Sequence, residues 1–117
     1  MKIVVRNQTR STILADAAEL ADTSEKRRTG LLKHESLGQG EGLWIVPCES
    51  VHSFFMKFAI DLVYMDKNKK VKKVRHSMVP WRVSACLSAH SILELPAGAV
   101  AATGTQAGDQ LVIEDLA

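Results

Sequence analysis

Long apolar runs are missing from this 117-residue sequence. No stretch reaches the roughly 18 uninterrupted apolar residues that a membrane-spanning helix needs. The apolar run near the N-terminus, Ile3 to Val5, is much shorter than the roughly 7–15 residues of a secretory signal. We therefore expect no membrane partner and a cytoplasmic location.

The chain also has few cysteines, and neither sign of charge predominates. The chain has two cysteines, Cys48 and Cys86. In a cytoplasmic protein they are expected to be free thiols, although two cysteines in a short chain could also form one disulfide. The 15 basic and 13 acidic residues leave a net charge of +2, which is too small to indicate a polyanionic partner.

Motifs of the common cofactor and catalytic sites do not occur. The sequence has no G-x-S-x-G elbow, no Walker loop and no dinucleotide fingerprint. A zinc site needs about three or four ligands, and no second paired Cys/His motif accompanies Cys48 and His52. We therefore expect no metal and no cofactor.

The composition indicates one folded domain. Apolar residues make up 46% of the chain and charged residues 24%, which is typical of globular proteins and argues against disorder. A chain of this length supports a single hydrophobic core. Residues 1–117 are thus expected to form one domain.

Short segments of strand character alternate with turn signals. We predict a helix at 23–34, capped by Thr23 or Ser24, and a short helix or turn at 97–104. Segment 13–22 also has helix-favouring Ala, Leu and Glu, but its place after a short strand and a polar loop favours a hairpin. Strands are predicted at 2–6, 13–22, 43–47, 51–66, 71–76, 91–96 and 109–115. The expected fold is α+β and mainly β, a small barrel or sandwich of about six to eight short strands with one or two short helices.

Five segments occur in an order that resembles one protein family. They read EKRRTGLL, EGLWIVPCESVHSFFMKFAIDLVYMD, PWRVS, ILELPAG and GDQL. This order resembles the prokaryotic domain family of unknown function 192 (DUF192), over about residue 21 to the end. The signature positions of the family correspond here to Phe55, Met56, Lys57, Asp61 and Asp66, to Leu93–Gly98, and to Gly108 and Asp109.

The resemblance has limited implications. A short loop and His52 ahead of the aromatic resemble one branch of the family, whereas many members carry a longer loop with an Asn. The resemblance implies a compact β-rich domain of bacterial origin. It implies no activity, so function has to be argued from the residues.

Residues 51–66 combine apolar alternation with charge. Even positions from Phe54 to Leu62 are apolar, whereas Ser53, Lys57 and Asp61 have the opposite parity. On a strand, Lys57 and Asp61 would lie on one side. They could form a surface ion pair, or Lys57 could anchor an anion in a cleft with Asp61 as its partner.

Three further residues are candidates for such a cleft. Glu94 lies between Leu93 and Leu95, so on a strand it faces away from both and could be exposed to solvent. Alternatively it pairs with Lys57 or Arg27 at the cleft. The candidate ligand-binding residues are Arg27, His52, Lys57, Asp61 and Glu94.

Two other functions compete with ligand binding. Cys48 and His52, or an acid/base pair that includes Glu94, could carry hydrolysis or group transfer. The basic run 67–76 could contact nucleic acid, but it contains no aromatic residue for base stacking, so a nucleic-acid partner is not expected there. A contact surface at Trp81 and Arg82 is a further possibility. The simplest hypothesis is a non-catalytic domain that binds a polar or anionic small ligand.

Overall fold

The computed structural model describes residues 1–32 and 34–116, which form a curled sheet, a small second sheet and two short helices. The large sheet has the strand order β6-β5-β8-β3-β2-β1-β9, and β4 pairs with β7 in a separate ribbon. The strands are β1 (Lys2–Asn7), β2 (Thr12–Ala21), β3 (Glu41–Ile45), β4 (Ser50–His52), β5 (Ile60–Met65), β6 (Val71–Met78), β7 (Val83–Ala85), β8 (Ser91–Pro96) and β9 (Leu111–Asp115). The helices are α1 (Ser24–Thr29) and α2 (Ala99–Thr103).

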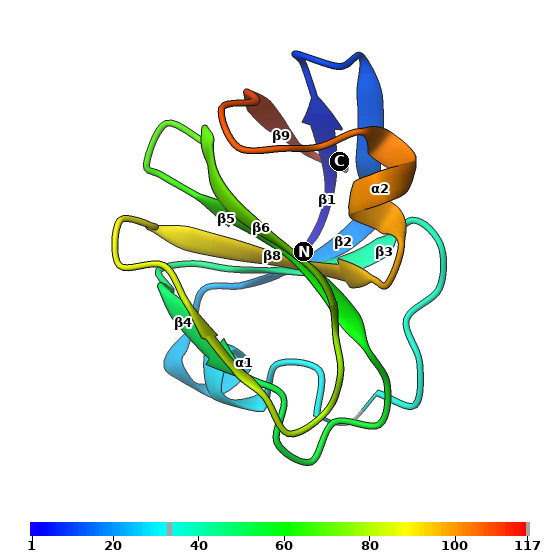
Figure 1. The fold of residues 1–117 in the computed structure, drawn as a ribbon, viewed down its shortest axis with the longest axis vertical. Helices are drawn as coiled ribbons and strands as arrows, with labels where there is room; N and C mark the ends of the chain where they lie inside the picture. Colours follow the sequence, from blue (N-terminus) through cyan, green and yellow to red (C-terminus); the bar gives the residue numbers. More distant parts are fainter. Residues whose placement is uncertain (33, 117) are drawn as a thin grey trace.

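The large sheet curls into a half-barrel. Its neighbouring strands are antiparallel except β2 and β3, which are parallel. The two edge strands β6 and β9 approach each other at one end, where Lys70 bridges to Gln110 and the Val71 amide donates to the Asp109 carbonyl at 2.8 Å. In Figure 1, α2 lies in the upper half of the molecule, whereas α1 and β4 lie in the lower half.

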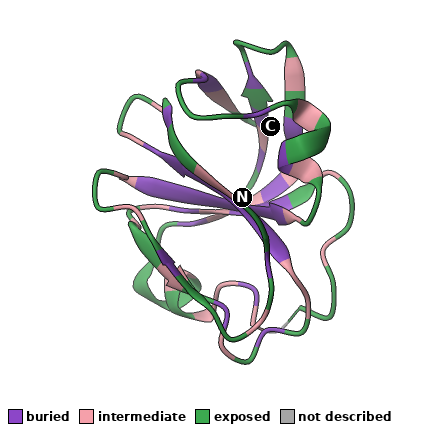
Figure 2. Ribbon diagram, viewed as in Figure 1, coloured by how far each residue is buried: buried purple, intermediate pink, exposed green. Residues whose placement is uncertain are grey.

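The central strands β5 and β8 are buried on both faces. Figure 2 shows the buried colour along these strands, and only the last residue of β8, Pro96, is intermediate. Because successive side chains of a strand point to opposite faces, β8 contributes Leu93 and Leu95 to one apolar cluster and Ile92 to another. Glu94 therefore faces the second cluster, on the side of α1 and the β4–β7 ribbon.

Most of the predicted elements are confirmed. Strands form within the predicted segments at 2–6, 13–22, 43–47, 71–76, 91–96 and 109–115, although β3 ends at Ile45 and β9 begins at Leu111. The ambiguous segment 13–22 belongs to strand β2. Thr23 caps α1, since its hydroxyl accepts from the Lys26 amide at 3.2 Å. The fold is mainly β, as predicted. It has nine strands in the described residues, and its large sheet is a curled half-barrel instead of a sandwich.

The prediction of one strand over 51–66 is wrong. Strand β4 ends at His52 and β5 begins at Ile60, so a loop separates them. Buried Ser53 begins this loop and binds the segment before β7, because its amide donates to the Arg82 carbonyl at 2.9 Å. The alternation of residues 54–64 thus combines a loop with a strand whose residues are all buried. Strand β7 was not predicted.

Neither helix of the described chain is long and apolar enough to cross a membrane.

Candidate functional site

A pocket of 240 Å³ lies between α1, the segment that follows it, and strands β3, β4 and β8. Its lining includes three of the five predicted ligand-binding residues, Arg27, His52 and Glu94, and also Cys48. These residues are far apart in sequence, and the sheet order brings them together. We call this cavity the Glu94 pocket.

Glu94 is a buried carboxyl group at this pocket. It is 4% exposed and pairs in register with Leu43 of β3 and Leu62 of β5, so its neighbours across the sheet are apolar. The chain after α1 passes over the carboxyl group at Gly30, where a Cβ atom would lie 3.9 Å from Glu94 Oε1. Gly30 has a φ of +50°, a left-handed conformation that suits glycine.

The environment of Glu94 favours its neutral form. Burial raises the pKa of this carboxyl from 4.5 to about 7. Among the described residues, no side chain or amide forms a hydrogen bond or ion pair with it. At neutral pH the group can therefore accept a hydrogen bond when ionised or donate one when protonated.

Basic side chains lie around the same pocket. Arg27 and Arg28 come from α1, whose last turn is basic. Arg27 uses one guanidinium nitrogen to donate to the Asp22 carbonyl at 3.0 Å, and Arg28 is exposed. A ligand at Glu94 would thus meet a positive charge at a second point of the pocket.

Cys48 and His52 line the pocket but do not form a nucleophile and base pair. The Cys48 thiol donates to the Ser50 carbonyl at 3.1 Å, and burial raises its pKa. His52 Nδ1 accepts from the Phe54 amide at 3.3 Å. A thiol with a raised pKa has little thiolate at neutral pH, so the geometry does not favour Cys48 as a nucleophile. Cys48 and Cys86 are both free and half-buried.

Lys57 and Asp61 lie in different environments, one exposed and one buried. The prediction that they share one face is therefore wrong. Lys57 lies in the exposed loop after β4 and forms an ion pair with Glu35. Asp61 lies inside β5 and is completely buried. The loop between β4 and β5 breaks the strand geometry on which the prediction depended.

Asp61 has a structural set of partners. Its carboxylate accepts from the amides of Ser77 at 2.8 Å, Gly98 at 3.1 Å and Val100 at 2.9 Å. Ser77 lies where the register of β5 and β6 shifts, and its φ is +48°. Asp61 therefore joins this irregular part of β6 to the start of α2, and its oxygens are occupied.

Asp109, in the third family signature, is also a buried structural carboxylate. Asn7 Nδ2 donates to it at 2.9 Å and Arg10 Nε at 3.1 Å, and the Gln106 amide donates at 3.1 Å. Desolvation would raise the pKa of Asp109, but these hydrogen bonds outweigh it and hold the pKa below its usual value. Asp109 thus joins the β1–β2 turn to the start of β9.

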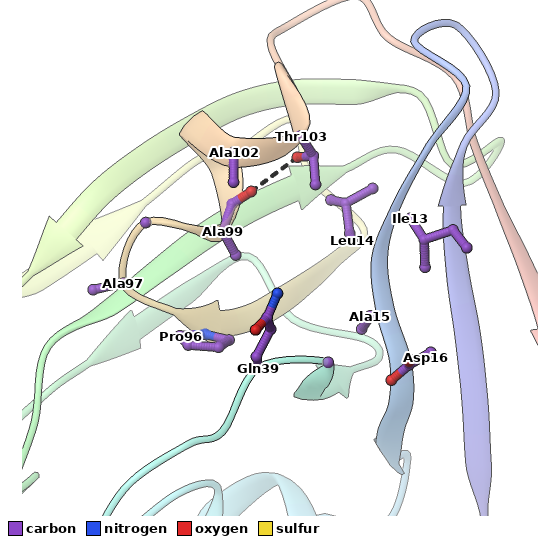
Figure 3. A pocket seen from close by; sticks show the side chains of 12 residues that line it. Ile13, Leu14, Ala15, Asp16, Gln39, Pro96, Ala97, Ala99, Ala102 and Thr103 are labelled. Atoms are coloured by element: carbon purple, nitrogen blue, oxygen red, sulfur yellow. Dashed lines mark hydrogen bonds between the residues drawn. The ribbon is translucent and has the colours of Figure 1, made fainter.

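A second cavity, of 480 Å³, lies between β2 and the segment that joins β8 to α2. Figure 3 shows that Ala, Pro and aliphatic side chains dominate its lining, with Asp16, Gln39 and Thr103 as the polar ones. Thr103 Oγ1 already donates to the Ala99 carbonyl at 2.9 Å, and the Gly98 amide donates to Asp61. We therefore regard the Glu94 pocket, with its unpartnered buried carboxyl, as the better candidate site.

No group of three or more His, Cys, Asp or Glu side chains in the described part of the chain is placed to hold a metal ion.

Comparisons with known proteins agree on the family. The model of DUF192, described as an uncharacterized ACR, matches residues 4–113. A UPF0127 protein of Pyrococcus furiosus is 30% identical over 111 residues, which cover 90% of this chain and 93% of that protein. A UPF0127 protein of Thermococcus sibiricus is 28% identical over 111 residues, 90% of this chain and 71% of that protein. These relatives are archaeal, so they do not support the expected bacterial origin.

Two crystal structures share the fold. One is a "putative transcription regulator" of Sinorhizobium meliloti 1021, with a TM-score of 0.82 and 19% identity over 95% of this chain and 91% of that one. The other is a protein of unknown function from Novosphingobium aromaticivorans, with a TM-score of 0.78 and 21% identity over 96% of this chain and 84% of that one. At these identities the likeness shows the fold alone. Because the family model matches nearly the whole sequence, the chain belongs to DUF192.

Proposed function

We propose that this protein is a non-catalytic domain that binds a small polar molecule in the Glu94 pocket. The observation that carries the proposal is the Glu94 carboxyl, which lies at a cavity, belongs to a residue that is only 4% exposed, and forms no hydrogen bond with the described residues. The fully enclosed side-chain polar atom without a partner in the described chain is Trp44 Nε1, so the Glu94 oxygens keep contact with the cavity. A buried carboxyl without a hydrogen bond costs stability, and most such groups in native proteins are paired. A ligand that donates to Glu94 would remove this cost.

The two ends of the pocket suit different groups of a ligand. Glu94 would accept from an amine or another N–H or O–H donor, and Arg27 would contact an anionic group, with Arg28 beside it. The cavity of 240 Å³ is smaller than the roughly 300–1,000 Å³ of pockets for drug-sized ligands. We therefore propose a small ligand with a donor at one end and an anionic group at the other, such as an amino acid.

A ligand-observed NMR screen of amino acids, small amines and small carboxylic acids tests this proposal. Compounds that bind should lose at least roughly tenfold in affinity in the Glu94→Gln variant, because the carboxylate supplies a charge-assisted hydrogen bond. Arg27→Gln should weaken the compounds that carry an anionic group. The matched control is Asp16→Asn, which changes a carboxylate of the other cavity.

The proposal fails if the compounds bind Glu94→Gln as tightly as the unchanged protein. It also fails if Asp16→Asn, and not Glu94→Gln, removes binding, because the ligand would then occupy the cavity beside β2. Failure of the whole panel to bind would remove the proposed ligand class.

Two finer assignments rest on the sequence alone and are part of the proposal. The chain would belong to the short-loop branch of DUF192 that has a histidine, here His52, ahead of the aromatic–Met–Lys signature. It would act in the cytoplasm.

A further inference from the structure

We propose that an exposed aromatic surface beside the β4–β7 ribbon binds single-stranded nucleic acid. The surface consists of His52, Phe54, Phe55 and Trp81, and we call it the aromatic platform. His52 stacks on Phe54 with ring centroids 4.9 Å apart, Phe54 lies 5.6 Å from Trp81, and Phe55 meets Trp81 edge to face at 4.8 Å. The four rings form one continuous cluster although Trp81 is distant in sequence from the other three.

The platform is exposed and its shape is fixed. Phe55 is 71% exposed and Trp81 is 56% exposed. Both have left-handed backbone angles, with φ of +66° and +68°, which bulky residues rarely adopt. Such strain persists only where the surrounding structure imposes it, and it is concentrated at functional sites.

Ser53 is the residue that imposes this geometry. It is completely buried, and its carbonyl accepts from the amides of Trp81 at 3.1 Å and Met56 at 3.2 Å. Its hydroxyl donates to the Val79 carbonyl at 2.7 Å and accepts from the Arg82 amide at 2.9 Å. These bonds join the loop after β4 to the loop before β7, so Phe55 and Trp81 are presented together on a rigid support.

Cations border the platform. Arg82 donates to the Trp81 carbonyl at 3.2 Å, Arg75 donates to the Val83 carbonyl at 2.9 Å, and Lys73 donates to the Ala85 carbonyl at 2.8 Å. None of these three side chains has a carboxylate partner in the described part of the chain. Their charge therefore remains available for a polyanion along the edge of β7.

Exposed aromatic rings beside unpaired cations are the combination that single-stranded nucleic acids need. Bases stack on the rings, and the cations contact the phosphates. In a duplex the bases are already stacked on one another, so the platform favours single strands. The basic run 67–76 has no aromatic residue of its own, but the fold brings its Arg75 to the Val83 carbonyl, two residues after Trp81 in the chain.

Fluorescence anisotropy with a short labelled oligodeoxythymidine, and with its duplex, tests the proposal. We expect the single strand to bind more tightly than the duplex and the affinity to fall as salt rises. Trp81→Ala and Phe55→Ala should each weaken binding roughly tenfold, since stacking on an aromatic side chain contributes about 1–3 kcal/mol per base. Trp81→Tyr should retain most of the affinity.

Matched controls separate the platform from general effects. Leu87→Ala removes another exposed apolar side chain, which is 81% exposed and outside the platform, and should leave binding unchanged. Arg82→Gln should reduce both the affinity and its salt dependence. Lys26→Gln removes an exposed charge of α1 and should change neither. Phe55→Ala keeps the test decisive if Trp81→Ala does not fold, as circular dichroism would show.

Several results would overturn the proposal. The proposal is wrong if the single strand does not bind, or if the duplex binds equally well. It is also wrong if the affinity depends on Lys67 of the basic run and not on Trp81 or Phe55. Analytical ultracentrifugation gives a further test. If the protein is a dimer and Trp81→Ala converts it to a monomer, the platform is a contact between two copies of the protein and the proposal is wrong. The two sites share His52, but Trp81, Phe55, Arg82 and Lys67 do not line the Glu94 pocket, so these results are independent of ligand binding there.

Discussion

Asp61 and Glu94 are two buried carboxyl groups on neighbouring strands, and their environments are opposite. In register, Asp61 pairs with Leu95 and Glu94 pairs with Leu62, so the two side chains point to opposite faces of the sheet. Asp61 accepts three amide hydrogen bonds, whereas Glu94 has no partner in the described chain and lies at a cavity. The fold supplies donors to one carboxyl group and leaves the other available to a ligand.

This difference gives the two predicted site residues different roles: Asp61 stabilises the fold, whereas Glu94 is proposed to bind a ligand. The donors to Asp61 belong to β6 and to the start of α2, so its removal would disconnect two elements. The neighbours of Glu94 are apolar side chains and the residues of the pocket, so its removal would disconnect no element. A substitution at each position should therefore have effects of opposite sign on stability.

The largest expected effect is that of Asp61→Ala. It leaves three amides without an acceptor, each at a cost of about 1–3 kcal/mol, so we expect a loss of roughly 3–5 kcal/mol. Urea unfolding at neutral pH measures it. A loss below about 1 kcal/mol would mean that water replaces the carboxylate and that the contrast with Glu94 is weaker than the structure indicates.

Glu94→Gln should stabilise the protein at neutral and higher pH. Because the pKa is raised from 4.5 to about 7, the folded state binds more protons than the unfolded state between these values, and the stability of the unchanged protein falls as pH rises through this range. Glutamine does not titrate, so the variant lacks this dependence of stability on pH. The difference in the free energy of unfolding should grow to roughly 3 kcal/mol above pH 7.

Urea unfolding of both proteins across this pH range measures the difference, in which the other titrating groups cancel. A difference that does not change with pH would show that Glu94 is solvated or paired.

Asp109→Asn should have a smaller effect, of about 1–2 kcal/mol at neutral pH, because it weakens a charge-assisted network. The pKa of Asp109 is lowered from 3.8, so its stabilisation is complete above this value and is lost as pH falls through the folded pKa. Acid unfolding should therefore begin at higher pH in the variant. Identical acid unfolding of the two proteins would contradict the lowered pKa.

Lys57→Ala should have the smallest effect. Its ion pair with Glu35 is exposed on both sides, and such pairs contribute about 0–1 kcal/mol. We expect a change below about 0.5 kcal/mol in thermal unfolding and no change in binding at the Glu94 pocket. Loss of ligand binding in this variant would show that Lys57 takes part in binding, contrary to the structure.

The sequence predicted much of the fold because most strands carry local signals. Segments 2–6, 91–96 and 109–115 are short apolar runs with turn residues on either side. Strand β7 lacks such signals, since Val83–Ala85 is three residues long and forms only through pairing with β4. Pairing partners this distant cannot be inferred from local pattern.

The candidate site was predicted in part for the same reason. The parity of Glu94 against Leu93 and Leu95 correctly indicates its face of β8. The donors to Asp61 lie at residues 77, 98 and 100, and nothing near Asp61 in the sequence indicates them. Of the platform, the sequence indicated only a possible contact surface at Trp81 and Arg82. The aromatic partners of Trp81 were missed, because the bonds of Ser53 bring Trp81 to Phe55.

The most direct test of the account is an NMR titration of the Glu94 side-chain carboxyl carbon in the unliganded protein. The account predicts a pKa near 7, the value of a buried carboxyl group without a partner. A pKa of 4.5 or below would contradict it, because Glu94 would then be solvated or already paired and would not await a ligand.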